Sequence, residues 1–268
     1  MTLILRPTLS PSAEPACLYC GAETNEPLTW ETFLALTTKQ ALLCSSCQSR
    51  FVHISGERCR GCSRPLAELS KGLVKEFRCR DCDSWENRHE TQGLLERNFS
   101  IYSYNDMMKD FIARWKYRGD AAMILAFREK LRTAFLHQFA GYMPVPLPLH
   151  PERLLERSFN QSALIAALIS QPLTITEHIK RLPRPLPVQE ILERTAHEQK
   201  QSKKSRAERI SFNELPFRIR KKKESLLKSK DIVLIDDIYT TGTTVRKAAA
   251  VLKQAGAGRI ASFTLVRG

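Results

Sequence analysis

Hydrophobic and polar positions after residue 100 alternate between short apolar runs and runs with helical spacing. Ile101–Tyr104 and Ile232–Ile235 predict strands, and the second is entirely apolar and mostly β-branched. Apolar side chains between Met107 and Trp115 recur at i, i+3 and i+4, which predicts an amphipathic helix that Asn105 or Asp106 would cap. Buried strands that alternate with helices predict an α/β fold, with a mostly parallel sheet and helices on both faces.

The rest of the chain extends this alternation. Further helices are expected over residues 121–139, 160–169 and 245–254. Further extended segments are expected over 143–149, which prolines punctuate, over 174–179 and over 260–266. We therefore assign residues 100–268 to one α/β domain.

The composition is that of an ordinary globular protein. Hydrophobic residues make up 43% and charged residues 26% of the 268 positions, which excludes a disordered or low-complexity chain. No apolar run approaches the ~18 residues that cross a bilayer, and Met1–Arg6 lacks the basic start of a secretory signal. We expect a cytoplasmic protein without membrane insertion.

Eight cysteines lie between positions 17 and 82, and none follows. Two residues between thiols place both sulfur atoms on one side of a tight turn, where they suit two corners of the tetrahedron that Zn²⁺ prefers. Eight thiolates then predict two structural zinc ions with four cysteine ligands each. The four pairs are Cys17 and Cys20, Cys44 and Cys47, Cys59 and Cys62, and Cys79 and Cys82.

A small double zinc ribbon and a linker are therefore expected over residues 1–99. Disulfides are the rival interpretation, but a cytosolic compartment and four identical pairs both argue against them. Joining consecutive pairs is the simplest arrangement of the two sites, and interleaved pairing stays open. Such a module would fold largely on the free energy of metal binding. A ribbon is compatible both with contact to nucleic acid and with docking to protein.

Positive charge is concentrated in one segment. The chain carries 42 Lys and Arg against 28 Asp and Glu, a formal net charge of +14. Residues 200–230 alone hold 12 basic and three acidic residues. A polyanion, either nucleic acid or a small polyphosphate, is the natural partner of such a segment, and a solvated loop that only aids solubility is the alternative.

The segment Ile232–Thr244 carries the most specific pattern in the chain. An apolar strand leads into Asp236 and Asp237, then into a short Thr-rich turn, then into a helix. Backbone N–H groups, hydroxyls and a helix N-terminus can surround one phosphate in such a turn, and the two carboxylates can accept hydrogen bonds from sugar hydroxyls. A phosphorylated ribose fits better than a nucleotide, because the Lys of a P-loop and the three glycines of a dinucleotide loop are missing. We call this turn the phosphate loop; its members are Thr240, Thr241, Gly242, Thr243 and Thr244.

At these residues the chain resembles a known family. The apolar strand, the two acidic residues and Thr-Thr-Gly-Thr-Thr are similar to the phosphoribosyl pyrophosphate (PRPP) motif of type I phosphoribosyltransferases. Val145–Leu149, followed by Arg157-Ser-Phe-Asn-Gln161, resembles the signature of the ComF family that reads Arg-Gly-Phe-Asn-Gln. Trp115–Asp120 resembles the family's Lys-Tyr-x-Gly-Asp segment. With the cysteine-rich start included, the resemblance covers almost the whole chain.

The resemblance implies a double zinc ribbon on a phosphoribosyltransferase-like domain. It implies a competence protein that handles incoming single-stranded DNA in natural transformation, beside the helicase-like partner ComFA. PRPP would bind with Mg²⁺ at the carboxylates and the phosphate loop, with Arg153 and Arg157 near the pyrophosphate. An active phosphoribosyltransferase with an unidentified acceptor is the alternative function. Ser158 stands where the family has Gly, so a turn that needs a positive φ would be strained there.

The resemblance also places residues 200–230 where type I enzymes carry a mobile loop that closes over PRPP. Because few aromatic residues lie in this segment, its contact with DNA would be driven by phosphate charge, blind to sequence and strongly dependent on salt. The candidate DNA contacts are Lys116 and Arg118, in the Trp115–Asp120 segment, and Lys203, Lys204, Lys221, Lys222 and Lys223, in the basic segment.

Overall fold

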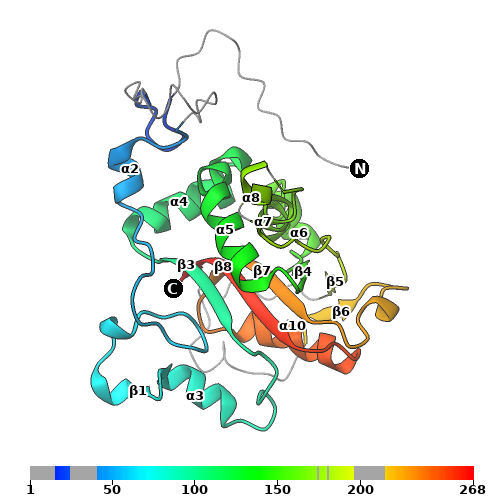
Figure 1. Ribbon diagram of the computed structural model, residues 1–268. Coiled ribbons are helices and arrows are strands. Elements are labelled where there is room, and N and C mark those ends of the chain that lie inside the picture. The colour runs from blue at the N-terminus through cyan, green and yellow to red at the C-terminus, as the bar shows by residue number, and fades with distance from the viewer. Residues whose placement is uncertain (1–15, 25–40, 174, 180, 196–214) are drawn as a thin grey trace.

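A four-stranded parallel sheet forms the centre of the structure, which is a computed structural model (Figure 1). Residues 16–24, 41–173, 175–179, 181–195 and 215–268 are described. The strands lie in the order β3 (Asn98–Ser103), β8 (Ile260–Arg267), β7 (Ile232–Tyr239) and β4 (Met143–Pro146). Each neighbouring pair is parallel, so the predicted α/β sheet is confirmed.

Three helices cover one face of this sheet (Figure 1): α4 (Asp106–Tyr117), α5 (Arg128–Phe139) and α7 (Gln161–Ile169). The 3₁₀ helix η3 (Ala121–Phe127) precedes α5. Val233 and Ile235 of β7 pack into the same core as these helices, because alternate side chains of a strand share one face. The helices predicted over 107–115, 121–139 and 160–169 therefore form, although the second begins as a 3₁₀ helix.

The other face packs against α10 (Thr243–Gln254) and against part of the cysteine-rich region. Ile232 and Leu234 of β7 share an apolar cluster with Leu252 of α10. The same cluster includes four cysteines, Cys59, Cys62, Cys79 and Cys82. This part of the cysteine-rich region thus shares a core with the sheet, and the expected boundary between residues 99 and 100 falls inside β3.

Shorter elements complete the described chain. Before the sheet they are α2 (Ser45–Ser49), η1 (Leu66–Glu68), η2 (Lys71–Leu73), β1 (Val74–Lys75), β2 (Arg78–Cys79) and α3 (Arg80–Glu86). After β4 they are α6 (Pro151–Arg157), α8 (Ile175–Ile179), β5 (Leu192–Arg194), β6 (Phe217–Ile219) and η5 (Glu224–Leu226). Strands β1 and β2 pair antiparallel, as do β5 and β6.

The expected strand over residues 174–179 is wrong, because Ile175–Ile179 forms the short helix α8. In this helix Glu177 makes an ion pair with Arg132 of α5, whose side chain is buried. A buried guanidinium requires a charged or hydrogen-bonding partner, so this tertiary contact outweighs the local preference of β-branched residues for strands.

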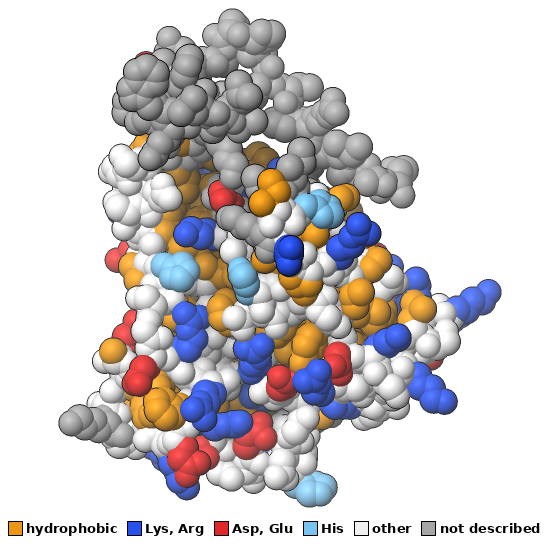
Figure 2. Space-filling model, viewed as in Figure 1, with side chains coloured by type: hydrophobic (Ala, Val, Ile, Leu, Met, Phe, Trp, Pro, Cys, Tyr) orange, Lys and Arg blue, Asp and Glu red, His pale blue; other side chains and the backbone are white. Residues whose placement is uncertain are grey.

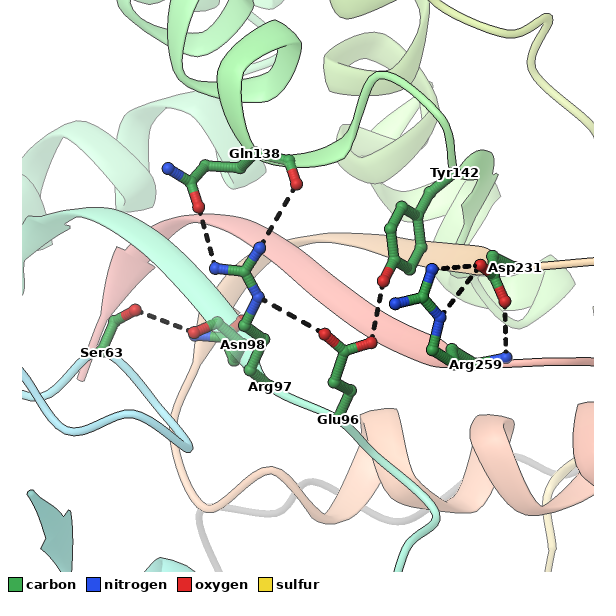
Figure 3. A network of polar contacts seen from close by, with 8 residues as sticks. All are labelled: Ser63, Glu96, Arg97, Asn98, Gln138, Tyr142, Asp231 and Arg259. Atoms are coloured by element: carbon green, nitrogen blue, oxygen red, sulfur yellow. Dashed lines mark hydrogen bonds and ion pairs between the residues drawn. The ribbon is translucent and has the colours of Figure 1, made fainter. Parts of the chain in front are cut away.

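Polar contacts hold the amino-terminal edge of the sheet together (Figure 3). Tyr142, just before β4, donates to Glu96 Oε2, just before β3, at 2.8 Å. Asp231, before β7, accepts from the backbone and the guanidinium of Arg259, before β8, and these bonds lower the pKa of Asp231. The strands are thus tied where they start, and the carboxyl-terminal edge, where parallel sheets bind ligands, remains available.

None of the described helices has the length and apolar character that would let it span a bilayer.

Candidate phosphate site and cysteine clusters

Asp236 and Asp237 lie near the carboxyl-terminal end of β7, which continues to Tyr239 rather than ending at Ile235. Asp237 is only 7% exposed and forms an ion pair with Lys116 at the end of α4. Asp236 Oδ1 accepts hydrogen bonds from Ser162 Oγ at 3.1 Å and from the Asp237 amide at 2.9 Å. The Asp pair therefore joins β7 to α4 and α7.

The two carboxylates differ in their surroundings. Burial, and then the charge of Asp237, raises the pKa of Asp236 from 3.8 to about 7. The Lys116 ammonium, the Asp237 amide and the Ser162 hydroxyl oppose this shift. Asp236 is therefore a carboxyl group that changes charge near neutral pH, beside an aspartate held in an ion pair.

The phosphate loop follows β7 and ends in α10. Gly242 precedes the helix with a left-handed backbone (φ 78°), and Thr243 is its first residue. The hydroxyls of Thr241 and Thr243 lie 2.9 Å apart, while Thr240 is exposed. No acidic residue lies in the first turn of α10, so the partial positive charge of the helix N-terminus is not neutralised from within the turn.

Gly242 is required at its position for two reasons. Its positive φ disfavours any residue with a Cβ. A Cβ there would also overlap the Tyr239 hydroxyl and the Arg246 guanidinium. The backbone of the loop thus lies directly on these two side chains.

Helix α6 carries the two arginines expected near a pyrophosphate. Arg153 pairs with Glu156 at 3.2 Å on the same helix. Arg157 donates to Gln161 Oε1 at 3.1 Å, and its guanidinium lies 5.5 Å from the centre of the Tyr117 ring. Arg157 is therefore adjacent to α7, which carries Ser162, whereas among the described residues the ion-pair partner of Arg153 is Glu156 on its own helix. A pyrophosphate role for either residue stays a prediction.

Ser158, which follows α6, has φ 64° and ψ −14°. The position does take the left-handed backbone that glycine favours, so this serine carries the expected strain. Asn160 then donates to the Leu147 carbonyl at 3.0 Å, which ties the turn to the end of β4.

The residues expected to contact DNA have different surroundings. Lys116 forms an ion pair with Asp237 and is largely buried, so Asp237 balances its charge. Arg118 is exposed, as are Lys221 and Lys222, and Lys223 is partly exposed. Figure 2 shows Lys and Arg side chains projecting where β6 and the following segment lie. Lys203 and Lys204 lie outside the described residues.

Consecutive cysteine pairs come together in two tetrads, so interleaved pairing is wrong. The first tetrad is Cys17, Cys20, Cys44 and Cys47, and the second tetrad is Cys59, Cys62, Cys79 and Cys82. Within each tetrad the sulfur atoms lie within 4.8 Å of one another, and two of the separations are 3.7 and 3.6 Å. Zn–S bonds of about 2.3 Å place tetrahedral sulfurs about 3.8 Å apart, so both tetrads fit a zinc ribbon.

The second tetrad is fully buried. The Cys79 amide donates to Cys59 Sγ at 3.2 Å, and Arg267 Nη2 donates to Cys62 Sγ at 3.5 Å. A Cβ on Gly61 would come within 2.8 Å of Cys82 Sγ, so glycine lets this turn close around the sulfurs. Hydrogen bonds to sulfur favour the thiolate form that a metal requires.

The first tetrad is more open and docks on α4. Cys20 is exposed, and Arg114 of α4 donates to the Tyr19 carbonyl at 2.8 Å. The Tyr19 hydroxyl donates to Asp110, also on α4. Burial raises the pKa of Cys17, but hydrogen bonds from the Cys20 and Cys44 amides outweigh it and bring the value to about 6.

Sequence reasoning missed two residues of the site. Ser162 lies one residue beyond the Arg157–Gln161 signature, within the helix expected over 160–169, whose pattern gives it no special role. Trp85 lies on α3, the helix that also carries Cys82, and its indole N–H donates to the Thr241 carbonyl at 2.9 Å. No local pattern identifies a contact between residues 156 positions apart.

Known proteins resemble this chain in the same regions. Residues 162–268 match the family described as the phosphoribosyl transferase domain. The chain is 35% identical over 255 residues to competence protein ComFC of Bacillus subtilis (strain 168), which covers 94% of each protein. It is 36% identical over 252 residues to competence protein ComFC of Streptococcus pneumoniae, covering 94% of this chain and 99% of that protein. Competence protein F of Haemophilus influenzae is 24% identical over 250 residues, covering 84% of this chain and 96% of that protein.

Proposed function

Because this chain belongs to the ComFC family of competence proteins and carries a phosphoribosyltransferase-like domain, we propose that it binds PRPP with Mg²⁺ and handles single-stranded DNA in natural transformation. In this proposal it acts in the cytoplasm beside the helicase-like protein ComFA. Its two cysteine tetrads hold structural zinc ions.

The observation that carries the proposal is the convergence of three segments at one edge of the sheet. Lys116 from α4 contacts Asp237 and Ser162 from α7 contacts Asp236, and the phosphate loop follows the Asp pair directly along β7. All three segments carry the motifs that resemble the family. A phosphorylated ribose needs this combination of carboxylates for its hydroxyls and backbone N–H groups for its phosphate.

Each part of PRPP has a partner in this arrangement. The 5′-phosphate takes the amides and hydroxyls of the phosphate loop, and the ribose hydroxyls take Asp236 and Asp237. Arg157, which donates to Gln161 at the start of α7, is the arginine of α6 that we assign to the pyrophosphate. Mg²⁺ bound with PRPP would neutralise part of the pyrophosphate charge, and the two carboxylates offer it oxygen ligands.

A separate surface supports binding of DNA. Lys221, Lys222 and Lys223 follow β6 and extend outward, and no ion pair to an acidic residue is found for them within the described chain. Unpaired surface cations release counterions from a nucleic acid when they bind its phosphates. The proposed DNA surface is therefore distinct from the carboxylates of the PRPP site.

Two variants separate the two ligands. Asp236→Ala with Asp237→Ala is expected to weaken binding of PRPP with Mg²⁺ by about 100-fold or more, since both charge-assisted contacts are lost. The affinity for single-stranded DNA at moderate salt should stay within twofold of the wild-type value.

Replacing Lys221, Lys222 and Lys223 by Ala should weaken binding of single-stranded DNA and leave binding of PRPP unchanged. It should also reduce the slope of log K against log salt by about 2. Calorimetry with PRPP and fluorescence anisotropy with an oligonucleotide measure both.

An unchanged PRPP affinity in the aspartate variant would remove the Asp pair from the site. Wild-type protein that binds neither ligand would overturn the proposal as a whole. Release of pyrophosphate from labelled PRPP, in the presence of cell metabolites, would show instead that the site turns PRPP over.

A further inference from the structure

We propose that the second tetrad and the phosphate loop form one coupled unit, in which Trp85 and Arg246 are the positioning residues for phosphate. This inference rests on the proposed phosphate site and adds a role for the cysteine-rich region in building it. Binding of a sugar phosphate and retention of the metal in the second tetrad would then stabilise each other.

The first contact is a hydrogen bond across the interface between the two parts. Trp85 lies on α3, whose residue Cys82 belongs to the second tetrad. Its indole N–H donates to the carbonyl of Thr241, in the middle of the phosphate loop, at 2.9 Å. Its carbonyl accepts from the buried Thr91 hydroxyl, which fixes the backbone behind it. The loop is therefore held from outside its own strand and helix.

The second contact is a guanidinium beneath the loop. Arg246, on the first turn of α10, is 2% exposed. It lies 4.7 Å from the centre of the Trp85 ring, and it donates to the Tyr239 hydroxyl at 2.7 Å and to the Gly242 carbonyl at 3.4 Å. No carboxylate of the described residues pairs with it. A buried cation without an anion is unfavourable, so an anion held by the adjacent loop would be stabilised there.

A second buried arginine, Arg267, connects Tyr239 to the cysteine sulfurs. Arg267, 4% exposed, donates to Cys62 Sγ and to the Tyr239 carbonyl, at 3.5 and 3.1 Å. Tyr239 thus lies between the two arginines, one on the side of the loop and one on the side of the tetrad. Four thiolates around Zn²⁺ carry a formal charge of −2, and Arg267, which donates to one of the sulfurs, is the guanidinium group that contacts them. Loss of the metal would therefore change the charge beside Arg267 and Tyr239. Tyr239 in turn accepts a hydrogen bond from Arg246, which also donates to the Gly242 carbonyl of the phosphate loop.

These contacts explain why Trp85 is a tryptophan. Phenylalanine would retain an aromatic face for Arg246, but it has no donor for the Thr241 carbonyl. The substitution Trp85→Phe therefore removes one bond to the loop and leaves the cysteines untouched. Tyr142→Phe is a matched control, because it removes one comparable hydrogen bond, to Glu96, at the opposite edge of the sheet (Figure 3).

The test uses the full chain loaded with two equivalents of zinc. Trp85→Phe is expected to weaken ribose 5-phosphate binding by about three- to tenfold, the range of one neutral hydrogen bond, with zinc content unchanged. Tyr142→Phe should leave this affinity within twofold of wild type. In wild-type protein, saturating ribose 5-phosphate should slow the removal of one of the two zinc equivalents by a chelator. Trp85→Phe should reduce that protection.

Equal affinities for Trp85→Phe and wild type, or equal slowing for both zinc equivalents, would overturn the coupling while leaving phosphate binding intact. Wild-type protein that does not bind ribose 5-phosphate or PRPP would instead overturn the proposed function. If Trp85→Phe does not fold, Arg246→Lys keeps the charge but cannot stack and bond as a planar group. It should weaken the same affinity, and an unchanged value would count against the inference.

Discussion

The two cysteine tetrads share one spacing motif but differ in what surrounds them. The first tetrad includes the exposed Cys20 and docks on the outside of α4 through Tyr19. The second tetrad is completely buried and lies in the same apolar cluster as α10 and β7. The motif therefore indicates a metal site in both cases, whereas only the surrounding fold decides whether that site also contacts the phosphate loop.

The second tetrad reaches the phosphate loop through the helix that carries its last cysteine. In the second tetrad, 16 residues separate Cys62 from Cys79 and form a short antiparallel pair, β1 and β2. Helix α3 then continues from Cys79 toward the sheet and delivers Trp85 to the phosphate loop. In the first tetrad, the described contacts outside its own segments are to α4 and the core beside it, away from the loop.

Replacing one cysteine should have the largest effect, and the effect should differ between the two tetrads. Cys62→Ser removes a metal ligand and the acceptor of Arg267, inside the core that α10 shares. We expect loss of one zinc equivalent, loss of ribose 5-phosphate binding and destabilisation comparable to the whole stability of a domain, about 5 kcal/mol or more. Cys20→Ser, at the exposed cysteine of the first tetrad, should also lose one zinc equivalent. Metal analysis, thermal unfolding and calorimetry measure these effects.

The comparison between tetrads requires that Cys20→Ser keep most of the ligand affinity. If both variants lose ribose 5-phosphate binding equally, the tetrads support the site equally and their different burial has no functional meaning.

Gly242→Ala should have the next largest effect, because the added methyl group crowds Tyr239 and Arg246, which connect the phosphate loop to the second tetrad. The new Cβ would overlap the Tyr239 hydroxyl and the Arg246 guanidinium. We expect ribose 5-phosphate binding to fall by about 100-fold and stability to fall by about 2 kcal/mol or more, from overlap added to the strain of a positive φ. Calorimetry and denaturant unfolding provide both values.

Gly256→Ala is the matched control, because Gly256 also has a positive φ (86°) but open space where its Cβ would be. It should show only the backbone strain, about 1 kcal/mol, with unchanged ligand affinity. Similar losses of affinity in both variants would mean that backbone strain alone explains the effect of Gly242→Ala. Tyr239 and Arg246 would then not be tightly packed against the phosphate loop.

Sequence alone predicts what depends on local pattern. The parallel sheet follows from apolar strands between helices, and the tetrads follow from the spacing of thiols. The phosphate loop follows from a strand, two carboxylates and a Thr-rich turn. In each case the determining residues are neighbours in the sequence, so their geometry is fixed by a few backbone angles.

Long-range contacts account for what the sequence did not indicate. Lys116 was expected on a DNA surface, but the fold brings it to Asp237, 121 residues later in the chain. The helix at Ile175–Ile179 depends on Arg132, and the role of Trp85 depends on Thr241. Contacts between elements far apart in the sequence decide such cases, and a single sequence contains no periodic signal for them.

The smallest expected effect is a dependence of PRPP affinity on pH. It distinguishes the influence of Lys116, on α4, from the influence of Trp85, beside the second tetrad. Burial and Asp237 raise the pKa of Asp236 to about 7, while Lys116 on α4 opposes the shift. Because the folded protein holds this proton more tightly than the unfolded chain, the stability it provides is present below pH 4 and lost as the pH rises to about 7.

Ribose hydroxyls and Mg²⁺ prefer the ionised carboxylate, so affinity for PRPP with Mg²⁺ should rise by about tenfold between pH 6 and 8. Phosphate groups of the ligand titrate in the same range, and Asp236→Asn isolates their share because it lacks this carboxyl group. Lys116→Met should move the midpoint above 7, whereas Trp85→Phe should lower the affinity at every pH without moving the midpoint. A midpoint that moves with Trp85 rather than with Lys116 would mean that the second tetrad, and not α4, controls the charge of the carboxylates.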